Sequence, residues 1–508
     1  MGPLGRVCLL LGAGMAAVAC DAASPGVSAV RSQDAITTES TTAVVDTTVS
    51  ATTVAPTTST TEPLPVQLID FGSTKAPRSY DSYLSAVFTD VARFWNEEYP
   101  LTYGTSYTPL SGGVFAAYAA RQEPIPGCGT PQTVYDDVQG NAFYCISADF
   151  VVYDDDQLLP QLVDSLGQSG VGVVLAHEFG HSIQARAGEW DHPTVLKEQQ
   201  ADCFAGAWAA HVARGEAPGL TFTDKDIKTG LMALIKFRDP VQGDSLADPG
   251  AHGSGFDRVG AFEDGYIGGP LRCKTIFTEN REATLIDIPF DPTDTNSGNL
   301  PVVDPVNHGD IVTLVPQDLN RYWTAVVATV SPNPFTPPSL VTYPQTGPFP
   351  PCASAGNDVF FAGNILYCPD TNQILVDQDL AVGLDTPGIS DEPQFGDLSV
   401  GYLIGVSYAE SVQSALGSTL GGKQRQLVDD CLVGSWLSDD IPPLSAERQQ
   451  DPLAISLSAG DLDEAVLVAL QVSDETADEN VAGTAFEKIA AFREGVLAGV
   501  STCLSHIR

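Results

Sequence analysis

Two histidines four residues apart, with a glutamate after the first, give this 508-residue sequence its clearest chemical feature. The segment HEFGH, from His177 to His181, lies in an apolar stretch whose pattern predicts a buried helix over residues 170–187. Residues four apart on a helix project from one face, so both imidazoles could bind one metal ion. Glu178 could then deprotonate a water molecule at an open coordination position. The pattern predicts a catalytic zinc site.

A third protein ligand is expected on a second helix, 17 residues after His181. Two imidazoles leave a catalytic zinc ion one protein ligand short, and Glu198 in the segment EQQAD could supply a carboxylate. Asp202, one helical turn later, could accept a hydrogen bond from the outer N–H of a ligating histidine. The alternative is that Glu198 and Asp202 form a solvated helix face. Their position after HEFGH favours the ligand interpretation.

His252 is the second candidate catalytic residue beside Glu178, and it opens the glycine-rich segment HGSGFDR. A histidine from this later segment could donate a hydrogen bond to the oxyanion formed when zinc-bound water attacks an amide. The alternative is an ordinary histidine of a surface loop. Arg258, in the same segment, could fix a carboxylate near the site or serve only the fold.

These side chains need a folded body to position them, and the composition is compatible with one. Hydrophobic residues make up 43% of the chain, which is enough to form real cores. The formal net charge is −40, from 24 basic and 64 acidic residues. This balance argues against a nucleic-acid partner and against electrostatic docking on an anionic membrane. Beyond residue 25 the sequence contains no long uncharged apolar run, which excludes a polytopic membrane protein.

Five blocks of the sequence recur at an offset that stays between 223 and 230 residues. The paired blocks begin at Phe94 and Tyr322, Phe143 and Leu366, Leu175 and Ile404, Asp202 and Asp430, and His252 and Ala482. One nearly constant offset across five separate blocks is not expected by chance. We therefore predict two tandem copies of one fold, over residues 66–285 and 286–508. The join near residues 286–305 is rich in Asp, Pro, Asn and Thr, as a linker should be.

The second predicted copy acts as an internal control, because it has lost every proposed catalytic side chain. The replacements are Val406 for His177, Ser407 for Glu178, Glu410 for His181, Gln426 for Glu198 and Ala482 for His252. Other positions persist in both copies: Gln184 and Gln413, Gly188 and Gly417, Asp202 and Asp430, Trp208 and Trp436. Residues confined to the first copy are candidates for function. Asp202 persists as Asp430, so it could also serve the fold.

Eight of the ten cysteines lie in the predicted body and divide evenly between the two copies. Disulfides are the default state of cysteines in an exported protein. Four cysteines allow three pairings in each copy, which the sequence alone does not separate. From the near pair and the far pair in each copy we predict Cys128–Cys145, Cys203–Cys273, Cys352–Cys368 and Cys431–Cys503. A cysteine metal cluster is the weaker alternative, because CxxC spacing is absent.

The N-terminus has the features of an export signal. Residues 1–20 carry one positive charge followed by an apolar run and end in AVAC. This ending resembles a bacterial lipobox, although Ala17 stands where Leu is usual, and it predicts lipidation of Cys20. An ordinary cleaved signal peptide is the alternative. Residues 21–65 are rich in Ser and Thr and lack aromatic residues, so we expect a disordered tether.

From about Phe143 to Cys273 the sequence resembles the neutral zinc metallopeptidases, a gluzincin-like bacterial family. The resemblance rests on FYC, HEFGHSIQ, EQQADCFAGAW and HGSGFDRVGAFEDG, in that order. It implies an α+β, zincin-like fold, mainly helical with a small sheet, together with Zn²⁺ and peptidase activity. His177, His181 and Glu198 match the metal ligands of the family, and Glu178 matches its base. The long tether and the second copy depart from the family pattern.

The leading hypothesis is an exported zinc endopeptidase of the cell envelope that cleaves a peptide or protein substrate. We expect its only membrane contact to be an N-terminal lipid anchor, and we expect the two copies to pack together. The second copy could cover the cleft, bind substrate or only stabilise the first copy. The alternative function is a non-catalytic envelope binding or scaffold protein built from two copies of a metallopeptidase fold. A metal-free secreted repeat protein is a third hypothesis.

Overall fold

The computed structural model describes residues 69–239, 251–279, 281, 285–286, 288, 299–355, 361, 363–385, 395–441, 455–473 and 483–507. All of these belong to one unit of the chain, Pro65–Arg508. The predicted signal peptide, its Cys20 and the predicted tether lie outside the described residues. Below, the first half means the described residues up to 285, and the second half means those from 286 onward.

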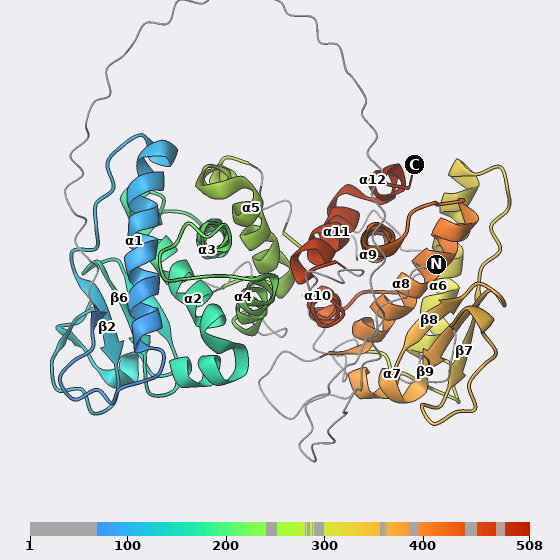
Figure 1. The fold of residues 1–508 in the computed structure, drawn as a ribbon, viewed down its shortest axis with the longest axis horizontal. Helices are drawn as coiled ribbons and strands as arrows, with labels where there is room; N and C mark the ends of the chain where they lie inside the picture. Colours follow the sequence, from blue (N-terminus) through green and yellow to red (C-terminus); the bar gives the residue numbers. More distant parts are fainter. Residues whose placement is uncertain are drawn as a thin grey trace, which may run out of the picture. The chain divides into compact units, whose positions relative to one another are not determined.

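A four-stranded sheet of order β1-β2-β6-β5 lies in the first half, and its two central strands, β2 and β6, are labelled in Figure 1. Its strands are β1 (Ile69–Asp70), β2 (Gly113–Ala117), β5 (Ala142–Cys145) and β6 (Phe150–Asp154). Strand β2 runs parallel to β1 and β6, whereas β5 runs antiparallel to β6. All five residues of β6 are buried, as expected for a strand covered on both faces. A separate short hairpin pairs β3 (Ile125–Pro126) with β4 (Gln132–Thr133).

The first half also contains five α-helices: α1 (Asp81–Tyr103), α2 (Leu158–Ala187), α3 (Thr194–Ala213), α4 (Asp224–Lys236) and α5 (Gly255–Lys274). Helix α2 packs against β5 and β6 and against α3, and α3 packs in turn against α5 (Figure 1). The helical path of α2 breaks at Gly167, which has the left-handed φ of 71° that glycine tolerates. The HEFGH segment therefore lies on the straight portion after this break, within the buried helix that the sequence predicts.

Glycines allow α3 and α5 to approach closely. A Cβ atom at Gly206 would lie 2.0 Å from the carbonyl oxygen of Phe262, and one at Gly265 would lie 1.7 Å from that of Cys203. The disulfide between Cys203 and Cys273 joins the same two helices. Helix α3, which carries Glu198, is thus fixed along its length by backbone contact and by a covalent bond.

The second half contains a three-stranded sheet of order β7-β9-β8. The strands are β7 (Ser339–Tyr343), β8 (Ile365–Cys368) and β9 (Gln373–Asp377). Strand β7 is parallel to β9 and β8 is antiparallel to it, which are the same directions as in the β2-β6-β5 part of the first sheet. The helices are α6 (Ile311–Val330), α7 (Gln378–Asp385), α8 (Asp397–Ala415), α9 (Gly422–Asp440), α10 (Asp461–Gln471), α11 (Ala485–Ala498) and α12 (Val500–Ser505).

Several buried contacts of the first half have counterparts in the second. The indole N–H of Trp208 donates to Asp90 at 3.0 Å, and that of Trp436 donates to Asp318 at 2.6 Å. Gly434 lies against the carbonyl of Phe492 much as Gly206 lies against that of Phe262. The duplication hypothesis predicts contacts of this kind, and the duplication itself stays a hypothesis.

The four disulfides predicted from cysteine spacing are all present: Cys128–Cys145, Cys203–Cys273, Cys352–Cys368 and Cys431–Cys503. The geometry thus selects one of the three pairings that the sequence left open in each half. The predicted α+β class, mainly helical with small sheets, is also confirmed. Among the described helices, none combines the length and the apolar character needed to cross a membrane.

Candidate metal centre

Helices α2 and α3 bring the three predicted ligands together. One atom each of His177, His181 and Glu198 lies within 4.8 Å of the others. His177 Nε2 is 3.1 Å from Glu198 Oε2, and His181 Nε2 is 3.4 Å from Glu198 Oε1. The three residues are only 4%, 9% and 8% exposed, so water does not screen them fully. Gly180, the glycine of HEFGH, allows α2 and α3 to lie this close together. A Cβ atom at this position would lie only 3.3 Å from the backbone of Ala201 on α3.

The outer nitrogens of both histidines face hydrogen-bond acceptors. His177 Nδ1 is 2.7 Å from Asp202 Oδ1, and His181 Nδ1 is 2.9 Å from Gln184 Oε1. The side-chain amide of Gln184 donates to the Lys197 carbonyl at 2.6 Å, which fixes which end of the amide faces His181. An acceptor at Nδ1 places the ring proton there and leaves a lone pair on Nε2. Both lone pairs therefore point toward Glu198.

This donor set fits a divalent metal ion such as Zn²⁺. Two Nε2 lone pairs and a carboxylate converge without a hydrogen atom between them, which is unfavourable unless a cation or a proton is present. Glu198 Oε2 is a buried oxygen that has no hydrogen-bond partner. Two imidazole nitrogens and one carboxylate oxygen are the protein ligands found in catalytic zinc sites that keep one position open.

The electrostatics of the site also favour a positive charge between His177, His181 and Glu198. Burial disfavours the imidazolium form, but Asp202 and Glu198 outweigh it and raise the pKa of His177 to about 10. Burial acts to raise the pKa of Glu198, but His181 and His177 outweigh it and hold that pKa well below its usual range. The ionised Glu198 is thus stabilised by a positive charge beside it, which either a proton on His177 or a divalent cation can supply.

Asp202 takes the position beside His177 that the sequence predicts, and Arg258 fixes it there. The guanidinium of Arg258 donates to both carboxylate oxygens of Asp202, each at 2.8 Å, and also to the carbonyl of Phe237 at 2.6 Å. Burial acts to raise the pKa of Asp202, yet Arg258 and His177 keep it lowered. A bidentate ion pair of this kind orients the carboxylate of Asp202 toward the ring of His177.

Glu178, the predicted base, lies next to His177 on α2 and is partly exposed. Burial raises the pKa of its carboxyl group, although His177 and His181 act in the opposite direction. A raised pKa brings a carboxylate closer to the range in which it can accept and return a proton near neutral pH.

His252 does not join the ligand group. Its side chain is 49% exposed, and its Nδ1 is 3.4 Å from Asp239 Oδ1. The backbone N–H groups of His252 and Gly253 donate to the same carboxylate, at 2.8 Å and 2.7 Å. It lies close enough to the site to act electrostatically on it, because it opposes the rise in the pKa of Glu178 and adds to the lowering of that of Glu198. His252 therefore stands at the rim of the site, where Asp239 orients it.

A carboxylate from the second half contacts residues that lie on either side of His252 in the sequence. Asp463 on α10 accepts a hydrogen bond from the backbone N–H of Phe256 at 2.8 Å, and its other oxygen is 2.8 Å from Arg238 Nε. Arg238 directly precedes Asp239, and Phe256 lies four residues after His252. No local pattern points to Asp463, because it is 207 residues from Phe256 in the sequence.

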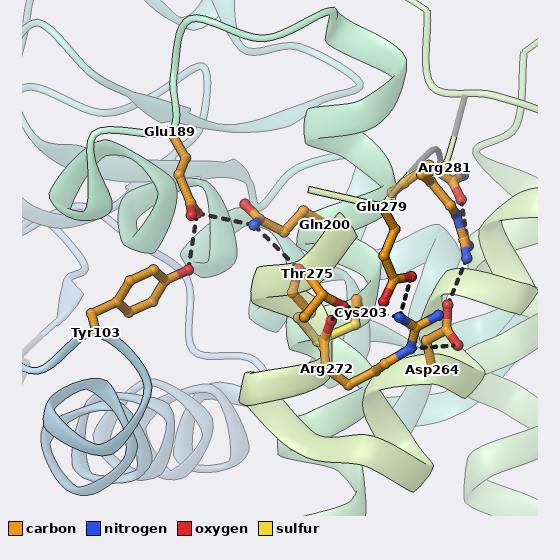
Figure 2. Close-up of a disulfide and its surroundings, with 11 residues drawn as sticks. Tyr103, Glu189, Gln200, Cys203, Asp264, Arg272, Thr275, Glu279 and Arg281 are labelled. Carbon is orange, nitrogen blue, oxygen red and sulfur yellow. Dashed lines mark hydrogen bonds and ion pairs between the residues drawn. A yellow bond between two sulfur atoms is a disulfide. The ribbon is translucent and has the colours of Figure 1, made fainter. Parts of the chain in front are cut away.

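The surroundings of the Cys203–Cys273 disulfide tie α3 to its neighbours (Figure 2). Gln200 donates to Glu189 Oε2 at 2.9 Å and to the carbonyl of Cys273 at 3.3 Å, while the hydroxyl of Tyr103 donates to the same oxygen of Glu189. Burial raises the pKa of Glu189. These contacts connect α3 with α1, with α5 and with the loop after α2, and so restrain the helix that carries Glu198.

In the second half, the residue that corresponds to Asp202 keeps an ion pair but faces no histidine. Asp430 is 2.8 Å from Lys488 Nζ and accepts a hydrogen bond from the hydroxyl of Tyr402. Gln413 donates to the Arg425 carbonyl at 2.9 Å, as Gln184 does to that of Lys197. Asp430 is thus satisfied by contacts that serve only the fold.

A family model described as "Putative neutral zinc metallopeptidase" matches residues 41–276. The resemblance inferred from the motifs is therefore confirmed for this part of the chain, which contains all three candidate ligands. The relatives are named only as uncharacterized proteins. YpfJ of Escherichia coli is 31% identical over 173 residues, which cover 29% of this chain and 57% of the relative. Mb2605 of Mycobacterium bovis and Rv2575 of Mycobacterium tuberculosis are 30% identical over 175 residues, or 58% of each relative.

The chain thus spans a little more than half the length of these relatives. No solved structure matches the chain.

Proposed function

We propose that this protein is a zinc metallopeptidase whose metal ion is held by His177, His181 and Glu198. One observation carries the proposal: the Nε2 atoms of two imidazoles converge on a buried carboxylate that has an oxygen without a hydrogen bond. The match of residues 41–276 to the metallopeptidase family supports the same conclusion. When bound, zinc would polarise the substrate carbonyl and lower the pKa of a water molecule beside it.

Glu178 is the general base of the proposed reaction. Its carboxylate accepts a proton from the attacking water and returns it to the amine nitrogen as the C–N bond of the peptide breaks. The raised pKa of Glu178 supports this role, because a carboxylate that holds its proton more tightly takes it up more readily.

Asp202 and Gln184 orient the two ligating rings through their Nδ1 atoms. Such partners keep the Nε2 lone pairs aimed at one point and increase the basicity of the ring that faces a carboxylate. His252 is proposed as a donor to the oxyanion from the rim of the site, in a position set by Asp239.

The second half is proposed to be a degenerate copy of the metallopeptidase domain, with a zincin-like fold that has lost its metal ligands. The matching strand directions, disulfides and tryptophan contacts support this interpretation. Its function is to stabilise the first half and, through Asp463, to hold the segment that carries His252. Of the roles considered for the second half, we therefore propose structural support of the first half and not substrate binding.

Export and lipid attachment at Cys20 remain part of the proposal and rest on the N-terminal sequence alone. Mass spectrometry of the mature N-terminus would test them. A diacylated Cys20 is the expected result, and a chain that begins elsewhere without lipid would contradict lipidation.

Peptide hydrolysis by the full chain tests the function most simply. We expect cleavage of a mixed peptide library by the zinc-loaded protein, and loss of cleavage in Glu178→Gln with the zinc content unchanged. Ser407→Ala, at the corresponding position of the second half, is the matched control and should keep full activity. Zinc binding without any cleavage, in wild type and Glu178→Gln alike, would favour the alternative of a non-catalytic binding or scaffold protein.

A further inference from the structure

Three carboxylates gather in the second half, far in sequence from the proposed zinc site. Asp397 begins α8, and Asp461 and Glu464 lie in the first turn of α10. One oxygen atom from each lies within 4.8 Å of the others. Asp397 and Asp461 are only 5% and 4% exposed, whereas Glu464 is partly exposed. The cluster thus concentrates negative charge in a mostly buried place.

Backbone N–H groups satisfy only part of this cluster. Asp397 Oδ2 accepts from the N–H of Leu300 at 2.9 Å and Glu464 Oε2 from that of Leu398 at 3.0 Å. Asp461 accepts from Ser458 at both oxygens, from the backbone N–H at 2.7 Å and from the hydroxyl at 2.6 Å. The second oxygen of Asp397, Oδ1, is buried and has no hydrogen-bond partner. A buried carboxylate oxygen without a donor is costly, and it indicates that something positive belongs beside it.

Protein cations do not fill this role within the described part of the chain. None of the ion pairs formed there involves Asp397, Asp461 or Glu464, and Arg238 pairs instead with the neighbouring Asp463. Burial, and to a lesser extent repulsion from Asp397, raises the pKa of Asp461 to about 8. The three acids therefore repel one another unless a cation or protons neutralise them.

We propose that Asp397, Asp461 and Glu464 bind a calcium ion. Hard carboxylate oxygens without imidazole or thiolate are the ligands that calcium prefers, and they are poor ligands for selecting zinc. One oxygen of each acid lies within 4.8 Å of the others, so small side-chain movements would let a single ion contact all three. Calcium accepts a flexible arrangement of six to eight oxygens, whereas magnesium demands near-ideal octahedral geometry. The partial exposure of Glu464 leaves room for water to complete the coordination.

The position of this site gives calcium a structural consequence. The ion would join the N-termini of α8 and α10, and Asp463 lies between two of its ligands in the first turn of α10. Asp463 is the residue that holds Phe256 and Arg238. Calcium would thus make the first turn of α10 more rigid. This is the turn that carries Asp463 and its contacts to Phe256 and Arg238. The calcium proposal itself does not depend on peptidase activity.

Calcium binding and thermal unfolding of the full chain test the proposal. The protein is stripped of metals, reloaded with one equivalent of zinc, and titrated with calcium by calorimetry. We expect one calcium ion per chain and a rise in Tm of about 2 °C or more at saturating calcium. Asp397→Asn and Glu464→Gln should each abolish both effects. Glu410→Gln, a partly buried acid elsewhere in the second half, and Glu198→Gln in the zinc site should keep them.

The sign of the mutational effect distinguishes a calcium site from three acids that serve only the fold. Without calcium, Asp397→Asn and Glu464→Gln should raise the Tm, because each removes repulsion among three acids. With calcium, both variants should melt below the wild type. Stabilisation in both conditions, or destabilisation in both, would overturn the proposal, as would the lack of saturable calcium binding by the wild type.

Discussion

Asp463 accepts a hydrogen bond from the backbone N–H of Phe256 at 2.8 Å, across 207 residues of sequence. Phe256 lies in the first turn of α5, the helix whose Arg258 fixes Asp202 beside His177. The same carboxylate pairs with Arg238, next to the Asp239 that orients His252. One side chain of the second half is thus joined to two parts of the candidate site in the first.

Replacing Asp463 should impair catalysis without removing the metal. Asp463→Ala loses the contacts to Phe256 and Arg238, so the segment carrying His252 is free to shift. We expect kcat to fall about tenfold or more, because small misplacements of catalytic groups are costly. Asp463→Asn keeps an acceptor for Phe256 and should recover part of this loss. Unchanged kcat in Asp463→Ala, with zinc content equal to wild type, would show that the second half does not position the segment.

Asp202 should influence both stability and zinc affinity, whereas its counterpart Asp430 should influence stability alone. Asp202→Asn leaves the buried Arg258 without its charge partner, at a cost of about 3–5 kcal/mol in the free energy of unfolding. It also weakens the contact to His177 Nδ1, so zinc affinity should fall about 10–100-fold. Asp430→Asn breaks the buried pair with Lys488 and should destabilise the chain similarly. Competition with a zinc-binding dye measures the affinities. Equal zinc affinity in both variants would contradict the role given to Asp202.

The pH dependence of peptide cleavage should reflect the titration of Glu178. A base acts only when it is deprotonated, so kcat/KM should decline as the pH falls through the pKa of the carboxyl group. Burial raises that pKa and the charge of a bound zinc ion lowers it, so the decline should follow the balance of these two effects and not the pH at which zinc is lost. Zinc content measured at each pH separates loss of the base from loss of the metal. A profile that stays flat down to the point of zinc loss would argue against Glu178 as the base.

The glycine contacts between α3 and α5 predict a stability effect. Gly206→Ala would place a Cβ atom 2.0 Å from the Phe262 carbonyl, so the two helices must move apart. We expect the free energy of unfolding to fall by about 1–3 kcal/mol, the usual cost of overpacking, and zinc affinity to fall with it because Glu198 is on α3. Gly188→Ala is not a suitable control, since Gly188 adopts a left-handed φ of 75°. Ala213→Gly, at the end of α3, tests the helix without the clash. If Gly206→Ala were as stable as the wild type in urea unfolding, the close contact of α3 and α5 would not depend on this glycine.

The sequence predicts the ligand set because its geometry is local. The spacing of His177 and His181 is converted into proximity by one helix, and Glu198 and Asp202 share a second helix. The cysteine pairs follow from spacing that recurs in both halves. The prediction for His252 is less complete, because its proximity to the site depends on how the turn before α5 is held, and the structure pairs it with Asp239 instead of the ligands.

The roles of Asp239, Asp463 and Gln184 could not be predicted, because each depends on tertiary contacts. Asp239 and Asp463 act on segments distant in sequence, and neither belongs to a motif. Gln184 carried a signal that was interpreted differently: its persistence as Gln413 indicated a scaffold role. The structure agrees with that role, since both side chains donate to a backbone carbonyl, but only Gln184 also faces a candidate metal ligand, His181.

The zinc content of the purified full chain tests the central claim most directly. After dialysis against zinc and removal of loosely bound metal, the account predicts about one zinc per chain in the wild type. It predicts loss of zinc in the double variant His177→Ala, His181→Ala, weakened binding in Glu198→Ala, and wild-type content in Glu410→Ala, the control at the position that corresponds to His181. A wild-type chain that retains no zinc, or a double variant that keeps it, would contradict the proposed metal centre.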